Sequence, residues 1–274
     1  MKCQCLIASY HKDFEWLIHC LASLKKFSRD FLPPVISVDS KDHAGCVAIV
    51  AQSYPEAIVK IEEGREGQGF MRAQLSMMSG DLLCPDADFV FLVGSDCIAT
   101  SEFRPDDYFA ANGKPIMLMS SYAALEKAHP GAVPWKPGVT RVLKFVPKYE
   151  YMRRLPIVYP KALFPALRAH VEGLHGKPFA DFIYESDKLH RNTSESNLLG
   201  AYAHKFMPDI FEWVDIGGDG VDNSPLPNMP NPLLQLWSHG GLDRPADSRF
   251  VYTVTKSAFG RKPRDIINEI VYGL

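Results

Sequence analysis

The chain has 274 residues, of which 46% are hydrophobic and 23% are charged, and this balance excludes a largely disordered protein. Its formal net charge of -2 gives the molecule as a whole no electrostatic attraction for nucleic acid. No apolar run reaches the roughly 18 residues that a membrane-spanning helix needs, so no membrane span is expected. The six cysteines include no CxxC pair, which argues against a zinc site or a disulfide framework and favours a reduced, cytoplasmic protein.

The first part of the chain alternates segments typical of strands and of helices. Apolar runs predict strands and periodic apolar positions predict helices: strands at 3–9, 34–40, 56–63 and 88–96, helices at 12–27, 44–54 and 69–83. Strands that are apolar throughout and alternate with helices predict an α/β fold, with a mostly parallel central sheet flanked by helices. The N-terminal residues are interpreted as the first strand rather than a secretory signal, because no small-residue cleavage site follows them.

The second part of the chain is less regular. The pattern predicts, in chain order, a strand within 112–122, a loop at 129–139, a strand at 156–159 followed by a helix, a helix capped by Ser194, a long loop at 217–237 and one or two closing helices. No internal repeat and no linker separates these segments. We therefore expect a single domain over 1–274, with one half at 1–111 and an irregular half at 112–274.

The most apolar run, Phe89–Gly94, leads directly into Ser95 and Asp96. Ligands of open α/β sheets bind at the carboxyl ends of the strands, so Asp96 is a candidate functional residue. One carboxylate at a strand tip suits a divalent cation that bridges the phosphates of a nucleotide. An ordinary turn residue is an equally good interpretation from position alone, because Asp is common after strands.

The segment "FLVGSDCI" resembles the metal-binding strand end of GT-A glycosyltransferases, and most closely the bacterial and phage families in which an apolar strand leads into D-S-D. Gly94, Ser95 and Asp96 stand at that triplet, so only its last acid is present. The resemblance implies that Asp96 holds Mn²⁺ or Mg²⁺ and that Ser95 lies beside the donor. It also implies a GT-A-like fold, with 1–111 as the nucleotide-sugar-binding half and 112–274 as the acceptor-side half with the closing helices.

Other segments of the first half carry the same resemblance. The N-terminal "LIASYHKDFEWLIHCLASL" is similar to the first strand, donor loop and first helix of such enzymes, and "ISVDS" and "GQGFMRAQLSMM" are similar to the second strand and to the helix before the metal strand. The donor-binding residues that this implies are Ala8, Ser9, Tyr10, Asp39, Arg72 and Gln74. Arginine suits paired phosphate oxygens. A surface ion pair is the alternative for Arg72.

Two acceptor-side and C-terminal residues complete the candidate site. In "SESNLLGAYAHKF", Glu195 matches the acid that the family places towards the acceptor, where a carboxylate takes a proton or stabilises positive charge. The alternative is a favourable acid in the first turn of a helix. In "LQLWSHGGLD", His239 resembles the late histidine that binds the metal in such enzymes. A structural histidine is the alternative there.

The predicted function is that of a glycosyltransferase that moves a sugar from a nucleotide-sugar donor to a hydroxyl group. The acceptor is either a saccharide or a hydroxymethylated base in DNA. Basic and aromatic residues interleave in "KYEYMRR" (148–154), which keeps the DNA acceptor open, although such charge runs are usually solvated. Two alternatives remain: an inactive sugar- or nucleic-acid-binding module, which Gly94 favours, and a nucleotidyltransferase, which the lack of glycine in "ASYHKDF" disfavours.

Overall fold

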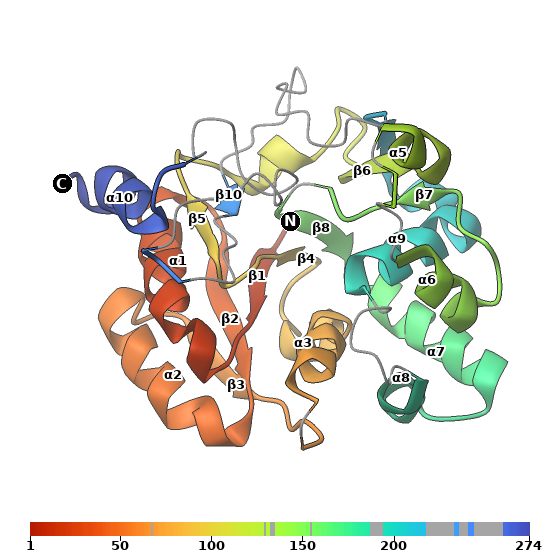
Figure 1. The fold of residues 1–274 in the computed structure, drawn as a ribbon, viewed down its shortest axis with the longest axis horizontal. Coiled ribbons are helices and arrows are strands. Elements are labelled where there is room, and N and C mark those ends of the chain that lie inside the picture. The colour runs from red at the N-terminus through yellow and green to blue at the C-terminus, as the bar shows by residue number, and fades with distance from the viewer. Residues whose placement is uncertain are drawn as a thin grey trace.

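The computed structural model describes residues 1–66, 68–128, 130–131, 135–153, 155–186, 194–217, 233–235, 241–243 and 260–274. Its centre is a five-stranded sheet in the order β3-β2-β1-β4-β8 (Figure 1). Four strands are parallel, namely β1 (Cys3–Ala8), β2 (Leu32–Val38), β3 (Ile58–Ile61) and β4 (Phe89–Leu92). The fifth, β8 (Ile157–Pro160), is antiparallel to β4. The predicted α/β fold with a mostly parallel sheet is confirmed.

Helices cover both faces of this sheet. One face packs against α1 (Phe14–Phe27) and α2 (Ser40–Ser53), and the other against α3 (Gly69–Met77) and α7 (Leu163–His175), with α9 (Glu195–Phe206) packed on α3 and α7 (Figure 1). Successive side chains of a strand point to opposite faces. Leu6 therefore lies in one hydrophobic core and Ile7 in the other, and both are fully buried. Burial on both faces explains why the strands are apolar throughout.

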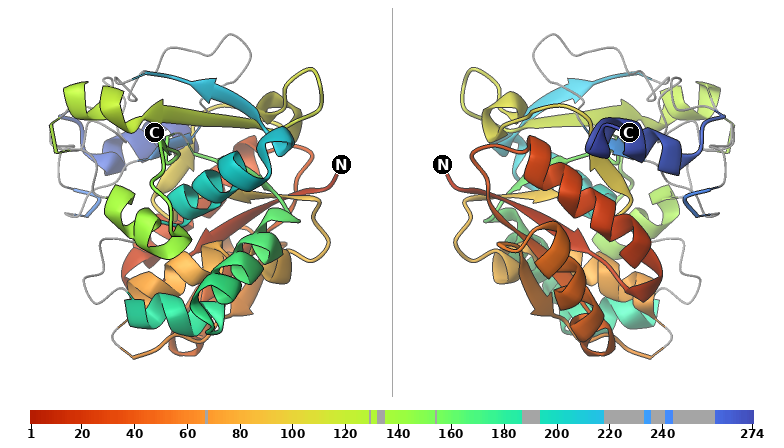
Figure 2. Two further views of the ribbon diagram at one scale, coloured as in Figure 1. Left: turned by 90° about the vertical axis from the view of Figure 1, so that its right-hand side faces the viewer. Right: turned by 90° about the vertical axis from the view of Figure 1, so that its left-hand side faces the viewer.

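The remaining elements surround this sandwich. The short helices are η1 (His11–Asp13), α4 (Gly80–Leu83), η2 (Pro105–Tyr108), α5 (Tyr122–Ala128), α6 (Trp135–Leu143), α8 (Phe179–Ser186), η3 (Pro208–Ile210), α10 (Pro263–Ile267) and the π-helix η6 (Asn268–Tyr272). The short strands are β5 (Cys97–Ala99), β6 (Ile116–Ser121), β7 (Tyr149–Glu150), β9 (Glu212–Asp215) and β10 (Leu233–Gln235). They form a three-stranded sheet β7-β6-β9 and the pair β10-β5. Figure 2 shows β6 and β9 side by side at the top of the molecule.

The connectivity of the sheet reverses between β1 and β4. From β1 the chain proceeds outward to β2 and β3 on one side, and β4 then pairs with β1 on its other side. The carboxyl ends of these four parallel strands share one edge of the sheet. In open α/β sheets, a crevice for ligands forms at such a switch point. The fold therefore places the candidate site outside the carboxyl ends of β1 and β4.

Four predicted segments differ from the structure. The helix expected at 69–83 is divided into α3 and α4. The loop expected at 129–139 is wrong from Trp135 onward, because α6 begins there. The helix tolerates Pro137 because a proline in the first turn loses no helical hydrogen bond. The long loop expected at 217–237 contains β10. The strand expected at 88–96 ends at Leu92, because Gly94–Asp96 turn the chain back into β5 along α1.

The C-terminal residues close the molecule over α1. Ile266, Ile267 and Val271 form a small core with Trp16 and Ile98. The Lys26 ammonium donates hydrogen bonds to the carbonyls of Ile270 and Val271, at 3.1 and 2.9 Å. All six cysteines are buried free thiols. Within the described ranges, none of the helices combines the length and the apolar character needed to cross a membrane.

Candidate active site

The candidate site begins where β1 and β4 end side by side. Ala8 is the last residue of β1, and the buried Ser9 follows it and donates its N–H to Ser37 O of β2 at 3.0 Å. Beyond β4 the chain reaches Ser95, which is buried, and Asp96, which is half-buried. Four sequence-predicted residues, Ala8, Ser9, Ser95 and Asp96, thus lie at the carboxyl ends of the two strands that flank the switch point.

The loop from Ser9 to Asp13 is fixed by three side chains from other elements. The Arg72 guanidinium donates from Nη2 to Ser9 O at 2.6 Å. His11 Nδ1 lies 3.0 Å from Asp42 Oδ1 on α2. Ser95 Oγ donates to Asp13 Oδ2 at 3.2 Å. A loop tied at its start, middle and end is ordered before any ligand arrives, which lowers the entropic cost of binding there.

Arg72 supports this loop from beneath. Its side chain is only 2% exposed, and its Nη1 donates to Ser37 Oγ and Ser76 Oγ, each at 3.4 Å. The surface ion pair considered as an alternative is therefore wrong: the described hydrogen bonds of Arg72 all end on neutral oxygens. Burial lowers the pKa of the guanidinium. The consequence is a buried positive charge near the sheet edge, which the negative charges of Glu62, Asp39 and Asp42 stabilise.

Asp13 was not predicted from the sequence. It stands at the N-cap position of α1, yet its carboxylate makes no capping hydrogen bond and accepts instead from Ser95 Oγ. Burial raises the pKa of Asp13, the hydrogen bond from Ser95 opposes this, and the negative charge of Glu15 adds to it. In the sequence an Asp before a helix is indistinguishable from an ordinary cap, and this hides its position at the site.

The geometry at Gly94 shows what a side chain at this position would meet. A Cβ atom at Gly94 would lie 2.7 Å from Asp96 Oδ1 and 3.2 Å from Cys97 Sγ. The Asp96 carboxylate therefore folds back over residue 94, where it also accepts a weak hydrogen bond from Cys97 Sγ at 3.9 Å. A side chain at position 94 would displace this carboxylate, so the glycine is a requirement of the Asp96 conformation.

Tyr10 and Asp39 lie at the same edge in different roles. Tyr10 is 40% exposed and meets the His11 ring edge-on, with 5.6 Å between the ring centroids. Its ring thus offers an aromatic surface next to the end of β1. Asp39 is the N-cap of α2, and its Oδ1 accepts from Lys41 N at 3.3 Å. Asp39 therefore has a structural task in addition to any contact with a nucleotide.

Gln74 and Glu195 connect α3 to the start of α9. Gln74 Oε1 accepts the backbone N–H of Glu195 at 2.7 Å, so this side chain of α3 satisfies the start of α9. Ser194 caps α9 as predicted, because its Oγ accepts from Asn197 N at 3.3 Å. The half-buried Glu195 carboxylate accepts from Ser196 Oγ at 2.9 Å. The predicted donor residue Gln74 thus points its amide oxygen to α9.

A buried polar network holds the start of α9 in place. Asn197 Oδ1 accepts from Tyr151 N at 2.9 Å, and its Nδ2 donates to Glu150 Oε1 at 3.2 Å and to Ser194 Oγ at 3.1 Å. Glu150 also forms an ion pair with Arg153. Glu150, Asn197 and Ser194 are all buried. These contacts fix Glu195, which directly follows Ser194, relative to the segment that leads into β8.

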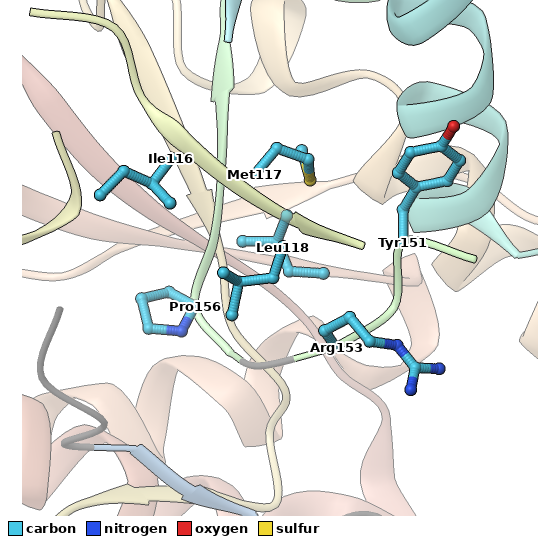
Figure 3. A pocket seen from close by; sticks show the side chains of 7 residues that line it. Ile116, Met117, Leu118, Tyr151, Arg153 and Pro156 are labelled. Carbon is cyan, nitrogen blue, oxygen red and sulfur yellow. The ribbon is translucent and has the colours of Figure 1, made fainter. Parts of the chain in front are cut away.

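The basic stretch at 148–154 does not form one exposed surface. Tyr151 is buried and its hydroxyl lies 2.8 Å from His204 Nδ1, and Arg153 is largely buried beside Glu150. Figure 3 shows both side chains at a recess that residues of β6 also line. The recess has room for about one water molecule, so it is too small for a sugar or a base. Arg154 lies outside the described residues.

His239 also lies outside the described residues, while short described segments stand on both sides of it. On one side, Gln235 of β10 pairs with Cys97, the residue after Asp96. On the other side, a Cβ atom at Gly241 would lie 3.8 Å from Glu15 Oε1, near the start of α1. The first of these segments pairs with β5, and the second lies near Glu15 in the first turn of α1.

The described side chains supply hard oxygen ligands for a divalent cation, but not a complete protein cage. No cluster of three or more His, Cys, Asp or Glu that could hold a metal occurs in the part of the chain that the structure describes. Ser95 Oγ and Asp13 are hydrogen-bonded at the sheet edge, and Asp96 directly follows Ser95 in the chain. Mg²⁺ is commonly bound through one or two carboxylates together with substrate phosphates, and this donor set fits that mode.

No protein-family model matches the sequence, and a search of the curated proteins finds no match either.

Proposed function

We propose that this protein is a metal-dependent GT-A-type glycosyltransferase, which moves a sugar from a nucleotide-sugar donor to a hydroxyl acceptor. One observation carries the proposal: at the β1/β4 switch point, the turn that contains Asp96 is bonded through Ser95 to a preordered loop, and the buried Arg72 cation holds the start of that loop. The resemblance of "FLVGSDCI" and its neighbouring segments to that family supports the same assignment. A nucleotide with a charged diphosphate matches both the carboxylates and the cation of this edge.

At the donor end of the proposed site, a few side chains each contact a different part of the nucleotide-sugar. Tyr10 presents an exposed aromatic ring to the nucleoside, and Asp39 lies at the neighbouring end of β2. Arg72 holds the Ser9 carbonyl and adds positive charge under the diphosphate. Asp96 and Ser95 supply oxygen ligands to Mn²⁺ or Mg²⁺, and His239 remains a predicted further ligand. When bound, the cation stabilises the negative charge that develops on the leaving diphosphate.

The acceptor end centres on Glu195. Its backbone is held by Gln74 and its carboxylate accepts from Ser196 Oγ. A carboxylate fixed in this way takes the proton of the attacking hydroxyl or stabilises positive charge at the sugar carbon. The acceptor itself is a hydroxyl compound, either a saccharide or a hydroxymethylated base in DNA.

Ligand-dependent thermal unfolding tests the proposal. Nucleoside diphosphates and nucleotide-sugars are added singly, with and without Mn²⁺, to the full chain and to Asp96→Asn. We expect one nucleotide to raise the unfolding midpoint only when Mn²⁺ is present, because a ligand of the native state stabilises it by mass action. Asp96→Asn should lose this shift, and its donor turnover should fall by about 10³-fold, equivalent to about 4 kcal/mol.

The products separate the competing functions. Release of a nucleoside diphosphate together with a free or transferred sugar supports the glycosyltransferase. Release of pyrophosphate would identify a nucleotidyltransferase, and a shift without turnover would identify a binding module. A complete panel without any shift contradicts the proposal.

A further inference from the structure

We propose that Asp13 is the second carboxylate of the cation site and takes the place of the acid that is absent at Gly94. The proposal deepens the function proposed above and rests on it, since it concerns the same cation. It assigns a ligand role to a residue of the loop after β1, outside the triplet that contains Asp96.

The first argument is the conformation of Asp13. An Asp at an N-cap ordinarily accepts from the backbone of the first helical turn, and this contact stabilises a helix by about 0.5–2 kcal/mol. Asp13 makes no such contact, although it occupies the N-cap of the 14-residue helix α1. Its Oδ2 accepts from Ser95 Oγ at 3.2 Å instead. Asp13 is also the last residue of η1 and lacks the extended backbone of an ordinary cap, so its carboxylate is bonded to the residue next to Asp96 rather than to the first turn of α1.

The second argument is the space at position 94. Asp96 Oδ1 lies 2.7 Å from the point where a Cβ of residue 94 would stand, so with Asp96 in this conformation no acid fits there. A second carboxylate must come from another element. The Asp13 carboxylate accepts a hydrogen bond from the Ser95 hydroxyl, which belongs to the turn after β4, 82 residues away in sequence.

The third argument is that the Asp13 carboxylate has no basic partner and the Ser9 hydroxyl has no hydrogen-bond partner among the described residues. Within the described ranges, Asp13 takes part in no ion pair with a lysine, arginine or histidine. Ser9, which begins the same loop, is 1% exposed and its Oγ has no hydrogen-bond partner. Buried polar atoms without partners are rare in folded proteins and are expected to gain them from a ligand or water. Carboxylate and hydroxyl oxygens are the ligands that Mg²⁺ and Mn²⁺ prefer.

Titration with Mn²⁺ alone tests the assignment without any turnover. Electron paramagnetic resonance of free Mn²⁺ is recorded for the wild type, Asp13→Asn, Asp96→Asn, Ser95→Ala and Glu15→Gln. The wild type should bind one Mn²⁺, and Asp13→Asn and Asp96→Asn should each bind it about 10- to 100-fold more weakly. Ser95→Ala should show a smaller loss, because it removes the hydroxyl that orients Asp13. Glu15→Gln removes the same charge from an exposed position nearby and should change the affinity by less than about twofold.

Circular dichroism of each variant ensures that only folded protein is compared, and Asn preserves the shape of Asp13. Wild-type affinity in Asp13→Asn would overturn the assignment, as would a wild type that binds no Mn²⁺. An equal loss in Glu15→Gln would also overturn it, because the effect would then be general electrostatics. Donor turnover by the wild type separates the two proposals. If the wild type turns over a donor and Asp13→Asn binds Mn²⁺ as tightly as the wild type, only the role of Asp13 is wrong. If Mn²⁺ binding requires Asp13 but the wild type turns over no nucleotide-sugar, only the proposed function is wrong.

Discussion

The β1/β4 edge and the start of α9 both contain buried polar groups, but the two regions differ in how many hydrogen bonds these groups form within the chain. At the edge, Ser9 Oγ and Asp42 Oδ2 are buried without a hydrogen-bond partner. At the start of α9, both side-chain polar atoms of Asn197 are bonded and Glu150 Oε1 accepts two hydrogen bonds, whereas Glu150 Oε2 has no hydrogen-bond partner and is paired with Arg153. A satisfied buried network rigidifies a fold, whereas an unsatisfied one costs stability. The comparison indicates a scaffold at α9 and a ligand site at the edge.

This difference predicts opposite consequences for substitutions in the two regions. In a satisfied network, the loss of one member leaves its partners buried and unbonded, so the native state is destabilised. At a ligand site, the loss of a strained or charged group impairs function and can raise stability. Stability and binding measurements on matched variants therefore distinguish the two regions.

The largest stability loss is expected for Asn197→Ala. The change leaves Tyr151 N without its buried partner and removes one of the two hydrogen bonds that Glu150 Oε1 accepts, which should lower the free energy of unfolding by about 2–4 kcal/mol. Denaturation in urea measures this. Asn112→Ala is the control, because Asn112 is exposed and bonds Glu212 at the surface, and it should cost less than about 0.5 kcal/mol. Equal losses in both variants would remove the scaffold interpretation.

Gly94→Asp tests the edge by restoring the acid that the triplet lacks. If the glycine merely marks a lost ligand, the new carboxylate should strengthen Mn²⁺ binding. The geometry predicts the reverse, because a Cβ at this position lies 2.7 Å from Asp96 Oδ1 and must displace it. We expect Mn²⁺ affinity to fall about tenfold, equivalent to about 1.4 kcal/mol. Gly173→Ala, where a Cβ meets nothing within 4 Å, should leave the affinity unchanged.

Gln74→Ala tests the connection between the two regions. The substitution removes the acceptor for Glu195 N and should lower the free energy of unfolding by about 1 kcal/mol, as the loss of a helix cap does. If Glu195 acts at the acceptor, kcat should fall while the donor KM stays constant. Gln52→Ala on the exposed surface of α2 should change neither quantity. A selective rise in donor KM would instead support the donor contact that the sequence predicts for Gln74.

The sheet and the position of Asp96 could be predicted because both follow from local patterns. Strands that are apolar at every position, such as the one that contains Leu6 and Ile7, require burial on both faces, and only helices on each side provide it. Asp96 then follows from the rule that ligands bind at the carboxyl ends of parallel strands. Residue type, order and spacing contain this information.

The contacts within the site could not be predicted in the same way. Ser95 bonds Asp13 across 82 residues and Gln74 bonds Glu195 across 121 residues, and no local pattern marks either pair. Asp13 has the position of a common N-cap, so its sequence context favours the wrong partner. The role of Gly94 depends on the rotamer of Asp96, which only the packed structure determines.

Asp13 also gives the edge a dependence of stability on pH. Burial raises its pKa above the usual Asp value of about 3.9, so ionisation is more costly in the folded state than in the unfolded chain. The contribution of this group to stability is therefore greatest while the carboxyl is protonated, and it is lost as the pH rises through the folded-state pKa. At pH 7 the ionised Asp13 lowers the stability of the metal-free protein.

Asp13→Asn should therefore stabilise the metal-free protein at pH 7 while it impairs the cation site. The amide removes the buried charge and its oxygen still accepts from Ser95 Oγ, so the midpoint of thermal unfolding should rise by about 1–3 °C. The gain should disappear below about pH 4, where the carboxyl is neutral in both states. Calorimetry at the two pH values measures the difference, and Asp86→Asn in an exposed turn should show no such rise. A lower midpoint for Asp13→Asn at pH 7 would mean that the carboxylate stabilises the fold, and the β1/β4 edge would then be a scaffold like the start of α9.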